Sequence, residues 1–263
     1  MTPLTVEDMR RIELEIMDEI HRVCTEHGLR YCLNYGTLLG ALRHGGFIPW
    51  DDDMDITMFR DEYEVLAAHF NEWCQVERFR LSWYRDGSGA CQFMKVVDTT
   101  TLVEEAFNRA EFATGVWVDI FPLDHYDEVI CAPAKKKMER LGLKRSFILT
   151  NPRVASNGGI ALAKKLVCPF VQNKDPKPLS QQMDELSRDM CPKATDLLVC
   201  AVNNEWQWIF PRDMFVPQEI DFEDRRYMAT AEYERLLTYY YGDWRTPPAP
   251  DNREMHTAKV YRL

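Results

Sequence analysis

The acidic run at residues 51–55 is the feature that most constrains how this 263-residue chain can fold. It places four carboxylates within five residues, and apolar residues alternate with the acids at its end. If residues 53–59 form a strand, this alternation puts Asp53 and Asp55 on one face, with their Cβ atoms about 6.6 Å apart. Two carboxylates at that spacing can share one hard cation, and Mg²⁺ takes carboxylates together with phosphate oxygens. The run therefore predicts a cation site on a half-buried strand, with a solvated acidic turn as the alternative.

Two further features support a phosphate-handling site. Asp119 is the only carboxylate within an apolar run that reads as a strand, and a buried carboxylate must be paired or bound to a metal. It is the natural third ligand, and a salt-bridged core aspartate is the alternative. Gly36 and Thr37 lie between a predicted strand and a predicted helix, where a phosphate can approach the backbone. The combination favours a nucleotidyltransferase-like core.

The composition excludes several classes of protein. Hydrophobic residues make up 46% of the chain and charged residues 28%, as in ordinary globular proteins. The net charge of −10 argues against binding to nucleic acid, which needs a basic face. No apolar run approaches the ~20 residues of a membrane-spanning helix, and the charged N-terminus does not resemble a secretory signal. We therefore expect a cytoplasmic protein, at the inner face of the membrane if it binds lipid, with eight reduced cysteines.

Periodicity and turn residues predict an α+β fold, because a helix is followed by mixed strands and then by further helices. The predicted helices span residues 7–27, 36–44, 61–73, 133–149, 158–171, 177–190 and 230–241. The predicted strands span residues 29–34, 54–59, 79–84, 91–97, 100–105 and 115–121, the last of them ended by Pro122. We expect one domain over residues 1–263, in which residues 131–192 form a helical, basic insertion or subdomain.

The charge is unevenly distributed. Residues 131–175 contain ten Lys or Arg and two acids, a charge of +8, which leaves −18 on the rest of the chain. Apolar residues lie beside the cations in both predicted helices of this segment. A basic amphipathic pair can lie on an anionic membrane surface, with Lys135–Lys137, Lys164 and Lys165 facing the lipid. The alternative is a pair of ordinary helices with solvated basic faces.

Three motifs together resemble the LicD family. They are NYGTLLGALRHGGFIPWDDDMDI at residues 34–56, DIFPLD at residues 119–124, and YGDW at residues 241–244, which is followed by Pro, Arg and His. The resemblance extends from about residue 10 to residue 256, and the three motifs occur in the same order as in the family. That family contains bacterial phosphocholine transferases and is related to fukutin and fukutin-related protein, which transfer ribitol phosphate.

The resemblance implies an enzyme that transfers a phospho-alcohol from a CDP-activated donor to a glycan. Phosphocholine from CDP-choline is the favoured group, the acceptor is a hydroxyl of a cell-surface glycan or its lipid-linked precursor, and CMP leaves. The expected cofactor is Mg²⁺ or Mn²⁺, held by Asp53, Asp55 and Asp119. Asp51 is a further acidic residue of the site, and either Asp51 or Asp119 is the expected general base. The other matching positions, expected to bind substrate, are Gly36, Thr37, Arg43, His44, Trp50, Asp124 and His256.

Two more groups are candidates for the donor. Lys95, like Arg43, can hold phosphate oxygens, although a surface ion pair is the alternative for each. A quaternary ammonium such as choline favours an aromatic cage, and the candidates are Trp83 with Tyr84, Trp206 with Trp208, and Tyr239–Tyr241. Core packing is the alternative for these rings.

Two other functions fit the same residues. One is nucleotidyl transfer, which attaches NMP to a small acceptor on the same fold. The other is a non-catalytic glycan-binding protein. The complete set of acids argues against this second alternative. The phosphorus atom that is attacked distinguishes the two enzymes, because one releases CMP and the other pyrophosphate.

Overall fold

The computed structural model describes residues 1–155, 157–249 and 259–263 and confirms the α+β fold. Its helices are α1 (Val6–His27), α2 (Tyr35–His44), α3 (Arg60–Trp73), α4 (Glu128–Leu149), α5 (Gly158–Val171), α6 (Lys177–Asp189) and α7 (Tyr233–Tyr241). Its strands are β1 (Thr2–Pro3), β2 (Cys32–Leu33), β3 (Asp55–Phe59), β4 (Phe79–Ser82), β5 (Met94–Asp98), β6 (Thr101–Glu104), β7 (Trp117–His125), β8 (Leu197–Val199), β9 (Ile209–Pro211), β10 (Pro217–Phe222), β11 (Arg225–Thr230) and β12 (Lys259–Arg262). Within these residues, no helix combines the length and the apolar character needed to cross a membrane.

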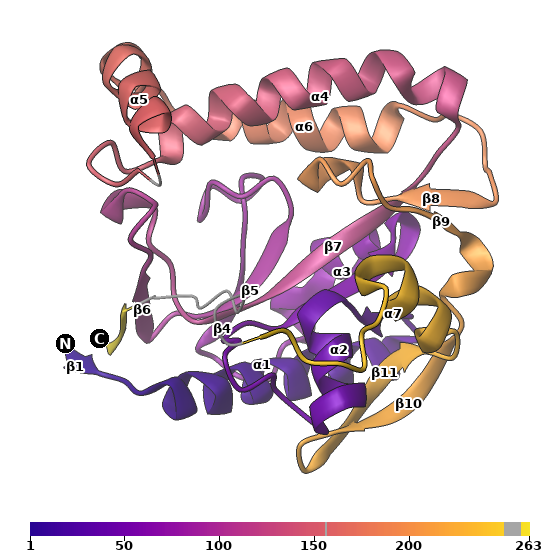
Figure 1. The fold of residues 1–263 in the computed structure, drawn as a ribbon. Coiled ribbons are helices and arrows are strands. Elements are labelled where there is room, and N and C mark those ends of the chain that lie inside the picture. Colours follow the sequence, from indigo (N-terminus) through magenta and orange to yellow (C-terminus); the bar gives the residue numbers. More distant parts are fainter. Residues whose placement is uncertain (156, 250–258) are drawn as a thin grey trace.

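The main sheet is mixed and has the strand order β2-β3-β7-β5-β4. Strands β3 and β7 are parallel, whereas β2, β5 and β4 pair antiparallel with their neighbours. Strand β8 extends the sheet from the far end of β7, and β9 pairs with β8. Figure 1 shows β7 crossing the molecule between α1 on one side and the helices α4 and α6 on the other. Because β3 and β7 are neighbours in the sheet, the acidic run that leads into β3 lies beside the DIFPLD motif of β7.

Helix α1 forms as its sequence predicts. Thr5 caps it in a capping box with Asp8, and Gly28 ends it with φ of 67°, a left-handed conformation that glycine adopts at little cost. Its apolar side chains recur at helical spacing and are fully buried, at Ile12, Ile16, Ile20 and Val23. The helix therefore covers one face of the sheet through a continuous apolar stripe.

The predicted end of β7 is wrong, because the strand continues through Pro122 to His125. Proline cannot donate a hydrogen bond to a neighbouring strand, so it is tolerated only where no partner needs its N–H. Strand β5 pairs with β7 only as far as Ile120, and β8 begins to pair at Asp124. Pro122 thus falls in the gap where β7 changes partners on that side.

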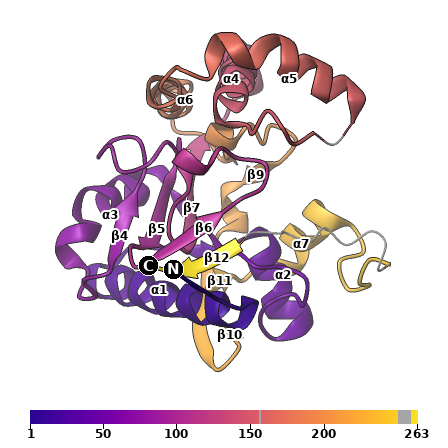
Figure 2. The same ribbon diagram turned by 90° about the vertical axis from the view of Figure 1, so that its left-hand side faces the viewer.

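Helices α4, α5 and α6 form a separate layer, which stands above the sheet in Figures 1 and 2. Residues of α4 and α6, together with the segment after β8, form their own apolar core, which includes Met138, Leu141, Met183 and Trp206. Helix α4 begins earlier than predicted, because the Asp127 side chain caps it by accepting from two backbone N–H groups. Helix α5 has the predicted bounds.

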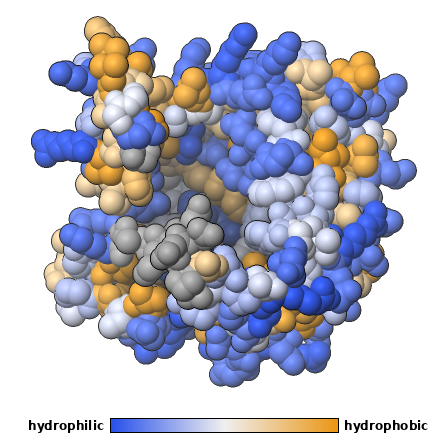
Figure 3. Space-filling view, in the orientation of Figure 1, coloured by the Kyte–Doolittle hydropathy of each residue, from blue (hydrophilic) through white to orange (hydrophobic). Residues whose placement is uncertain are grey.

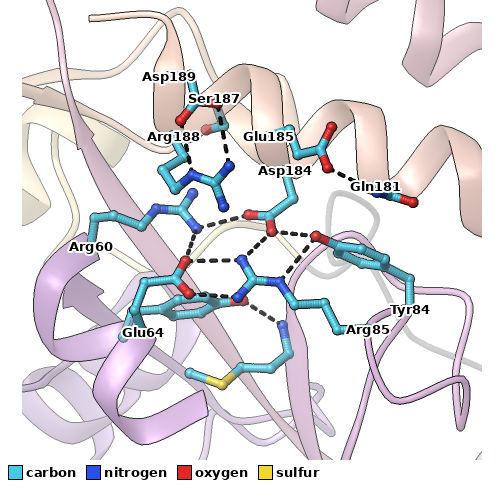
Figure 4. Close-up of polar contacts among 12 residues, drawn as sticks. Arg60, Glu64, Tyr84, Arg85, Gln181, Asp184, Glu185, Ser187, Arg188 and Asp189 are labelled. Atoms are coloured by element: carbon cyan, nitrogen blue, oxygen red, sulfur yellow. Dashed lines mark hydrogen bonds and ion pairs between the residues drawn. The ribbon is translucent and has the colours of Figure 1, made fainter. Parts of the chain in front are cut away.

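An ion-pair network joins α6 to the sheet, and Figure 4 shows the part of it that surrounds Asp184. Arg60 donates both to Asp124 of β7, at 2.7 and 2.8 Å, and to Asp184 of α6, at 2.8 Å. Asp184 also accepts from Arg85 at 2.5 Å and from the Tyr84 hydroxyl at 2.6 Å. Burial alone would lower the pKa of Arg60, but Asp124 and Asp184 raise it well above its ordinary value, so its charge is secure. These contacts fix the helical layer over the end of β7.

The C-terminal third contains strands that the sequence did not predict. Strands β10 and β11 form an antiparallel hairpin, and β12 lies between β1 and β6, so both described ends of the chain belong to one small sheet. Thr230 ends β11 opposite Pro217, so the predicted helix at 230–241 begins later, at Tyr233. All eight cysteines fall within the described residues and are free.

Candidate active site

The site is built on the register of two parallel strands. Asp55, the first residue of β3, is the register partner of Asp119 in β7, and such strands lie about 4.8 Å apart. Two hydrogen bonds hold this edge: the Asp55 N–H donates to Thr37 Oγ1 at 2.8 Å, and the Asp119 N–H donates to the Met54 carbonyl at 2.9 Å. Asp53 lies in the loop just before β3 and not on the strand as predicted.

Four carboxylates interact across this edge, and we call Asp51, Asp53, Asp55 and Asp119 the acidic cluster. Burial raises the pKa of Asp55 well above its ordinary value, and the charges of the other three carboxylates raise it further. Burial also raises the pKa of Asp119, although Lys95 opposes that shift. The structure therefore brings together all four acids predicted to be catalytic.

Lys95 is bound to Asp119. It is the register partner of Asp119 on β5, and its Nζ lies 2.8 Å from Asp119 Oδ1 and 3.2 Å from Oδ2. The indole of Trp117 donates to Asp119 Oδ2 at 3.1 Å, and its ring lies 4.1 Å from Lys95 Nζ. Lys95 thus compensates one carboxylate of the cluster directly. Both hydrogen bonds fall on Asp119 Oδ2, and the buried Oδ1 has no hydrogen-bond donor among the described residues, which leaves it available to a cation.

Gly36 leaves room for the Asp51 carboxylate, which lies against it. A Cβ atom at Gly36 would sit 2.5 Å from Asp51 Oδ2, well inside van der Waals contact. The loop that carries Asp51 is held from α1, where Arg10 donates to the carbonyls of Ile48 and Asp51 at 2.8 and 2.6 Å. The predicted turn at Gly36 therefore does contact the acidic cluster.

A cleft of about 440 Å³ opens beside the cluster. The residues lining it include Gly36, Arg43, Trp50, Asp51, Tyr241 and Trp244. Arg43 donates to the Trp244 carbonyl at 3.0 Å, and its guanidinium lies 6.0 Å from the Trp50 ring centroid. Burial raises the pKa of Tyr241, and the charges of Asp55, Asp51 and Asp53 raise it further. Four predicted residues thus meet two aromatic rings from the YGDW motif in one cleft.

The remaining predicted residues lie in different surroundings. The Thr37 hydroxyl is engaged by the Asp55 N–H, and the His44 ring packs edge-on to Trp50 at 5.8 Å. Burial and the charge of Arg43 lower the pKa of His44, which favours its neutral form. Asp124 belongs to the ion-pair network, about 16 Å along β7 from Asp119 at ~3.3 Å per residue. His256 lies outside the described residues.

Most of the predicted aromatic cages serve the core. Trp83 is buried against Tyr63, Trp206 belongs to the core of the helical layer, and the Tyr240 hydroxyl donates to Asn34. Tyr241 is the member of the predicted set that lines the cleft.

Sequence analysis did not identify two residues of α1 that interact with the acidic loop, Arg10 and Glu13. Glu13 is buried, with 2% of its surface exposed, and its Oε2 has no hydrogen-bond partner among the described residues. Burial raises its pKa well above the ordinary value, and the nearby charges of Asp53 and Asp52 raise it further. A signal was present, because Glu13 falls on the apolar stripe of α1, where a carboxylate is out of place.

The acidic cluster has the chemistry of a site for a hard divalent cation. Its donors are carboxylate oxygens, which Mg²⁺ and Mn²⁺ prefer, and the pKa of Asp55 is raised even with Lys95 beside the cluster. A bound dication would reverse that shift. Among the residues that the structure describes, no three His, Cys, Asp or Glu side chains already stand at metal-binding geometry.

Comparisons with known proteins agree with this site. Residues 28–135, which carry all four acids, match the family model "LicD/FKTN/FKRP, nucleotidyltransferase domain". The chain is 29% identical to the lipopolysaccharide cholinephosphotransferase LicD of Haemophilus influenzae, and the alignment covers the whole of both chains. It is also 51% identical to the human ribitol 5-phosphate transferase FKRP over 35 residues, which are 13% of this chain and 7% of that protein. The resemblance to the LicD family drawn from the motifs is therefore confirmed, by a match to the family's domain over residues 28–135 and by similarity to LicD along the whole chain.

Proposed function

We propose that this chain is an enzyme that transfers a phospho-alcohol from a CDP-activated donor to a hydroxyl of a glycan, with CMP as the leaving group. The observation that carries the proposal is the register of Asp55 with Asp119, which assembles the acidic cluster at the edge of a cleft. The relative from Haemophilus influenzae is a lipopolysaccharide cholinephosphotransferase, so phosphocholine is the favoured group and lipopolysaccharide or a similar glycan the favoured acceptor.

The acidic cluster is the proposed cation site. Asp53, Asp55 and Asp119 would hold Mg²⁺, which supplies neutralisation of the charge that develops on the phosphates. Lys95 opposes the rise that burial causes in the pKa of Asp119, and it orients that carboxylate through a contact of 2.8 Å. Gly36 leaves room for the Asp51 carboxylate beside the turn, and Thr37 fixes the start of β3.

Of the two acids expected as general base, the surroundings favour Asp51. A base must reach the acceptor hydroxyl with a free oxygen. Asp119 is ion-paired with Lys95 and is not among the described residues that line the cleft, whereas Asp51 lines it. We therefore assign proton removal to Asp51 and orientation of the cluster to Asp119.

The walls of the cleft suit a choline donor. Trp50, Tyr241 and Trp244 line it next to the carboxylates of Asp51 and Asp243. A quaternary ammonium is attracted to aromatic faces, and nearby carboxylates add to that attraction. Arg43, on the same wall, can hold a phosphate oxygen, although it is already bonded to the Trp244 carbonyl.

The test is product analysis with purified protein. The protein is incubated with Mg²⁺, lipopolysaccharide as acceptor, and CDP-choline, CDP-ethanolamine or CDP-ribitol in turn. The proposal predicts CMP and a phosphorylated glycan, both lost on addition of EDTA and in Asp55→Asn. Asp61→Asn, an exposed aspartate at the start of α3, is the matched control and should keep full activity. CTP with a small acceptor is run alongside, and pyrophosphate from that reaction would indicate nucleotidyl transfer instead.

A further inference from the structure

Helix α5 has an apolar face that no part of the described protein covers. Leu162, Leu166 and Phe170 recur at intervals of four residues, so they form one stripe along the helix. Their exposed fractions are 59%, 62% and 76%. None of them belongs to either apolar core that the described residues form. Three large apolar side chains in line on one surface are unusual for a protein that meets only water.

The opposite face of α5 holds the helix firmly in this orientation. Lys164 is buried and donates through Nζ to the carbonyls of Asn151 and Val154, at 3.1 and 2.6 Å. Cys168, one turn further on, is buried too. The expectation that Lys164 faces lipid is therefore wrong, because it anchors the helix from within. Because Lys164 and Cys168 face inward, the apolar stripe on the opposite side of α5 faces outward.

Exposed cations lie on α5, just beyond its end, and along the neighbouring helix α4. Lys165 is exposed next to Leu166, and Lys174 is exposed just beyond the helix. Across α4, the side chains of Lys135, Lys136, Lys137, Arg140 and Lys144 are exposed as well. The segment that carries them has a charge of +8 in a chain of −10, so the positive potential of this protein is concentrated here.

The shape of the molecule agrees with a docking role. Figure 3 shows an apolar column at the upper left of this view, where Figure 1 places α5, and the surface is hollowed to the right of it. The column projects from the helical layer and is bordered by hydrophilic surface. A projecting apolar stripe with cations beside it is what an interfacial amphipathic helix presents to a bilayer.

From these observations we propose that α5 docks the protein onto an anionic lipid membrane. Leu162, Leu166 and Phe170 enter the interface between headgroups and acyl chains, and Lys165 and Lys174 contact the headgroups. A net negative chain would be repelled from such a surface, so the local positive charge selects the orientation of docking. The inference rests on α5 alone and does not depend on the proposed reaction.

Vesicle co-sedimentation of the full chain tests the proposal. The vesicles are phosphatidylcholine alone and phosphatidylcholine mixed with phosphatidylglycerol. We expect binding to the mixed vesicles that weakens with salt and is lost when Leu162, Leu166 and Phe170 are all changed to Ser. Each cation near an anionic surface contributes about fivefold to binding, so Lys165→Glu with Lys174→Glu should weaken binding by at least twenty-fivefold, about fivefold for each of the two. The matched control changes Val65, Leu197 and Val216 to Ser, which are exposed apolar residues outside α5.

A second measurement protects the test against a folding defect in the triple variant. In Phe170→Trp, brominated lipid in the mixed vesicles should quench the added tryptophan emission. Absence of quenching, or equal sedimentation with neutral and anionic vesicles, would overturn the proposal. So would a parent protein that binds no vesicle, or one that self-associates through α5 in solution as judged by gel filtration of the parent and the triple variant.

Discussion

Asp55 and Asp119 occupy the same register position on the parallel strands β3 and β7. This pairing joins the acidic run to the DIFPLD motif, and Lys95 is the partner of Asp119 on its other side. The cluster therefore contains a carboxylate whose pKa is raised and one that is held by a lysine. The two aspartates should respond differently to mutation.

Asp55→Asn removes one of several like charges that repel each other in the absence of a cation. We expect the metal-free variant to be as stable as the parent or slightly more stable, because burial and neighbouring carboxylates raise the pKa of Asp55. Phosphotransfer should fall about 100-fold or more, since an electrostatic contact at the reacting centre is lost. Urea denaturation and a CMP-release assay measure the two effects. A variant that unfolds without metal would show that Asp55 is structural.

Asp119→Asn should destabilise the protein, in contrast to Asp55→Asn. It leaves the Lys95 ammonium, which is 17% exposed, without its carboxylate. Removing one partner of a buried pair costs about 3 kcal/mol. The double variant with Lys95→Met should recover most of that loss while remaining inactive. A double-mutant cycle by urea denaturation checks this, and additive losses would mean that the ion pair contributes nothing.

Gly36→Ala should disturb the site more than the fold. The new Cβ would meet Asp51 Oδ2 at 2.5 Å, so the carboxylate must move. The atom that must shift is the end of a flexible side chain, so we expect little change in stability, and we expect activity to fall at least about tenfold because Asp51 lines the cleft. Gly158→Ala is the control, because a Cβ there would meet nothing within 4 Å. Unchanged activity in Gly36→Ala would remove Asp51 from the proposed mechanism.

Asp184 should make the protein sensitive to acid. Burial would raise its pKa, but Arg60, Tyr84 and Arg85 lower it below the ordinary value of 3.8. A carboxylate with a lowered pKa stabilises the folded state fully above 3.8, and this contribution is lost as the pH falls below it. Asp184→Asn should therefore cost about 3 kcal/mol near neutral pH and progressively less in acid. Denaturation at a series of pH values tests this, and a loss that is the same at every pH would contradict it.

Local signals in the sequence predicted much of the site. Helix α1 has a cap at each end and an apolar stripe, and α5 lies between the predicted bounds because its start and end signals are local. The acids of β3 and β7 were recognisable because carboxylates in apolar strands need partners. We expected these acids to lie together, and the register of the two strands explains why they do.

What the sequence did not predict depends on pairing between distant segments. From the sequence, Pro122 predicts the end of a strand. The strand continues because β7 changes its neighbour from β5 to β8 at this point. Strand β12, near the C-terminus, pairs with β1 at the N-terminus and with β6, about 160 positions earlier in the sequence. Asp124 looked like part of the site because it closes DIFPLD, but Arg60 holds it in the network under α6. Tyr241, at the end of α7, lines the cleft together with residues of α2, against which α7 packs.

The central claim is that the acidic cluster binds a CDP-alcohol through a divalent cation. The most direct measurement is a thermal-shift panel of CDP-choline, CDP-ethanolamine and CDP-ribitol, each with and without Mg²⁺. Binding at a hundredfold excess over Kd stabilises the native state by about 2.7 kcal/mol. We predict a rise in Tm with at least one CDP-alcohol, only when Mg²⁺ is present, and no rise in Asp55→Asn. No shift with any of them, or an equal shift without Mg²⁺ and in Asp55→Asn, would contradict the account.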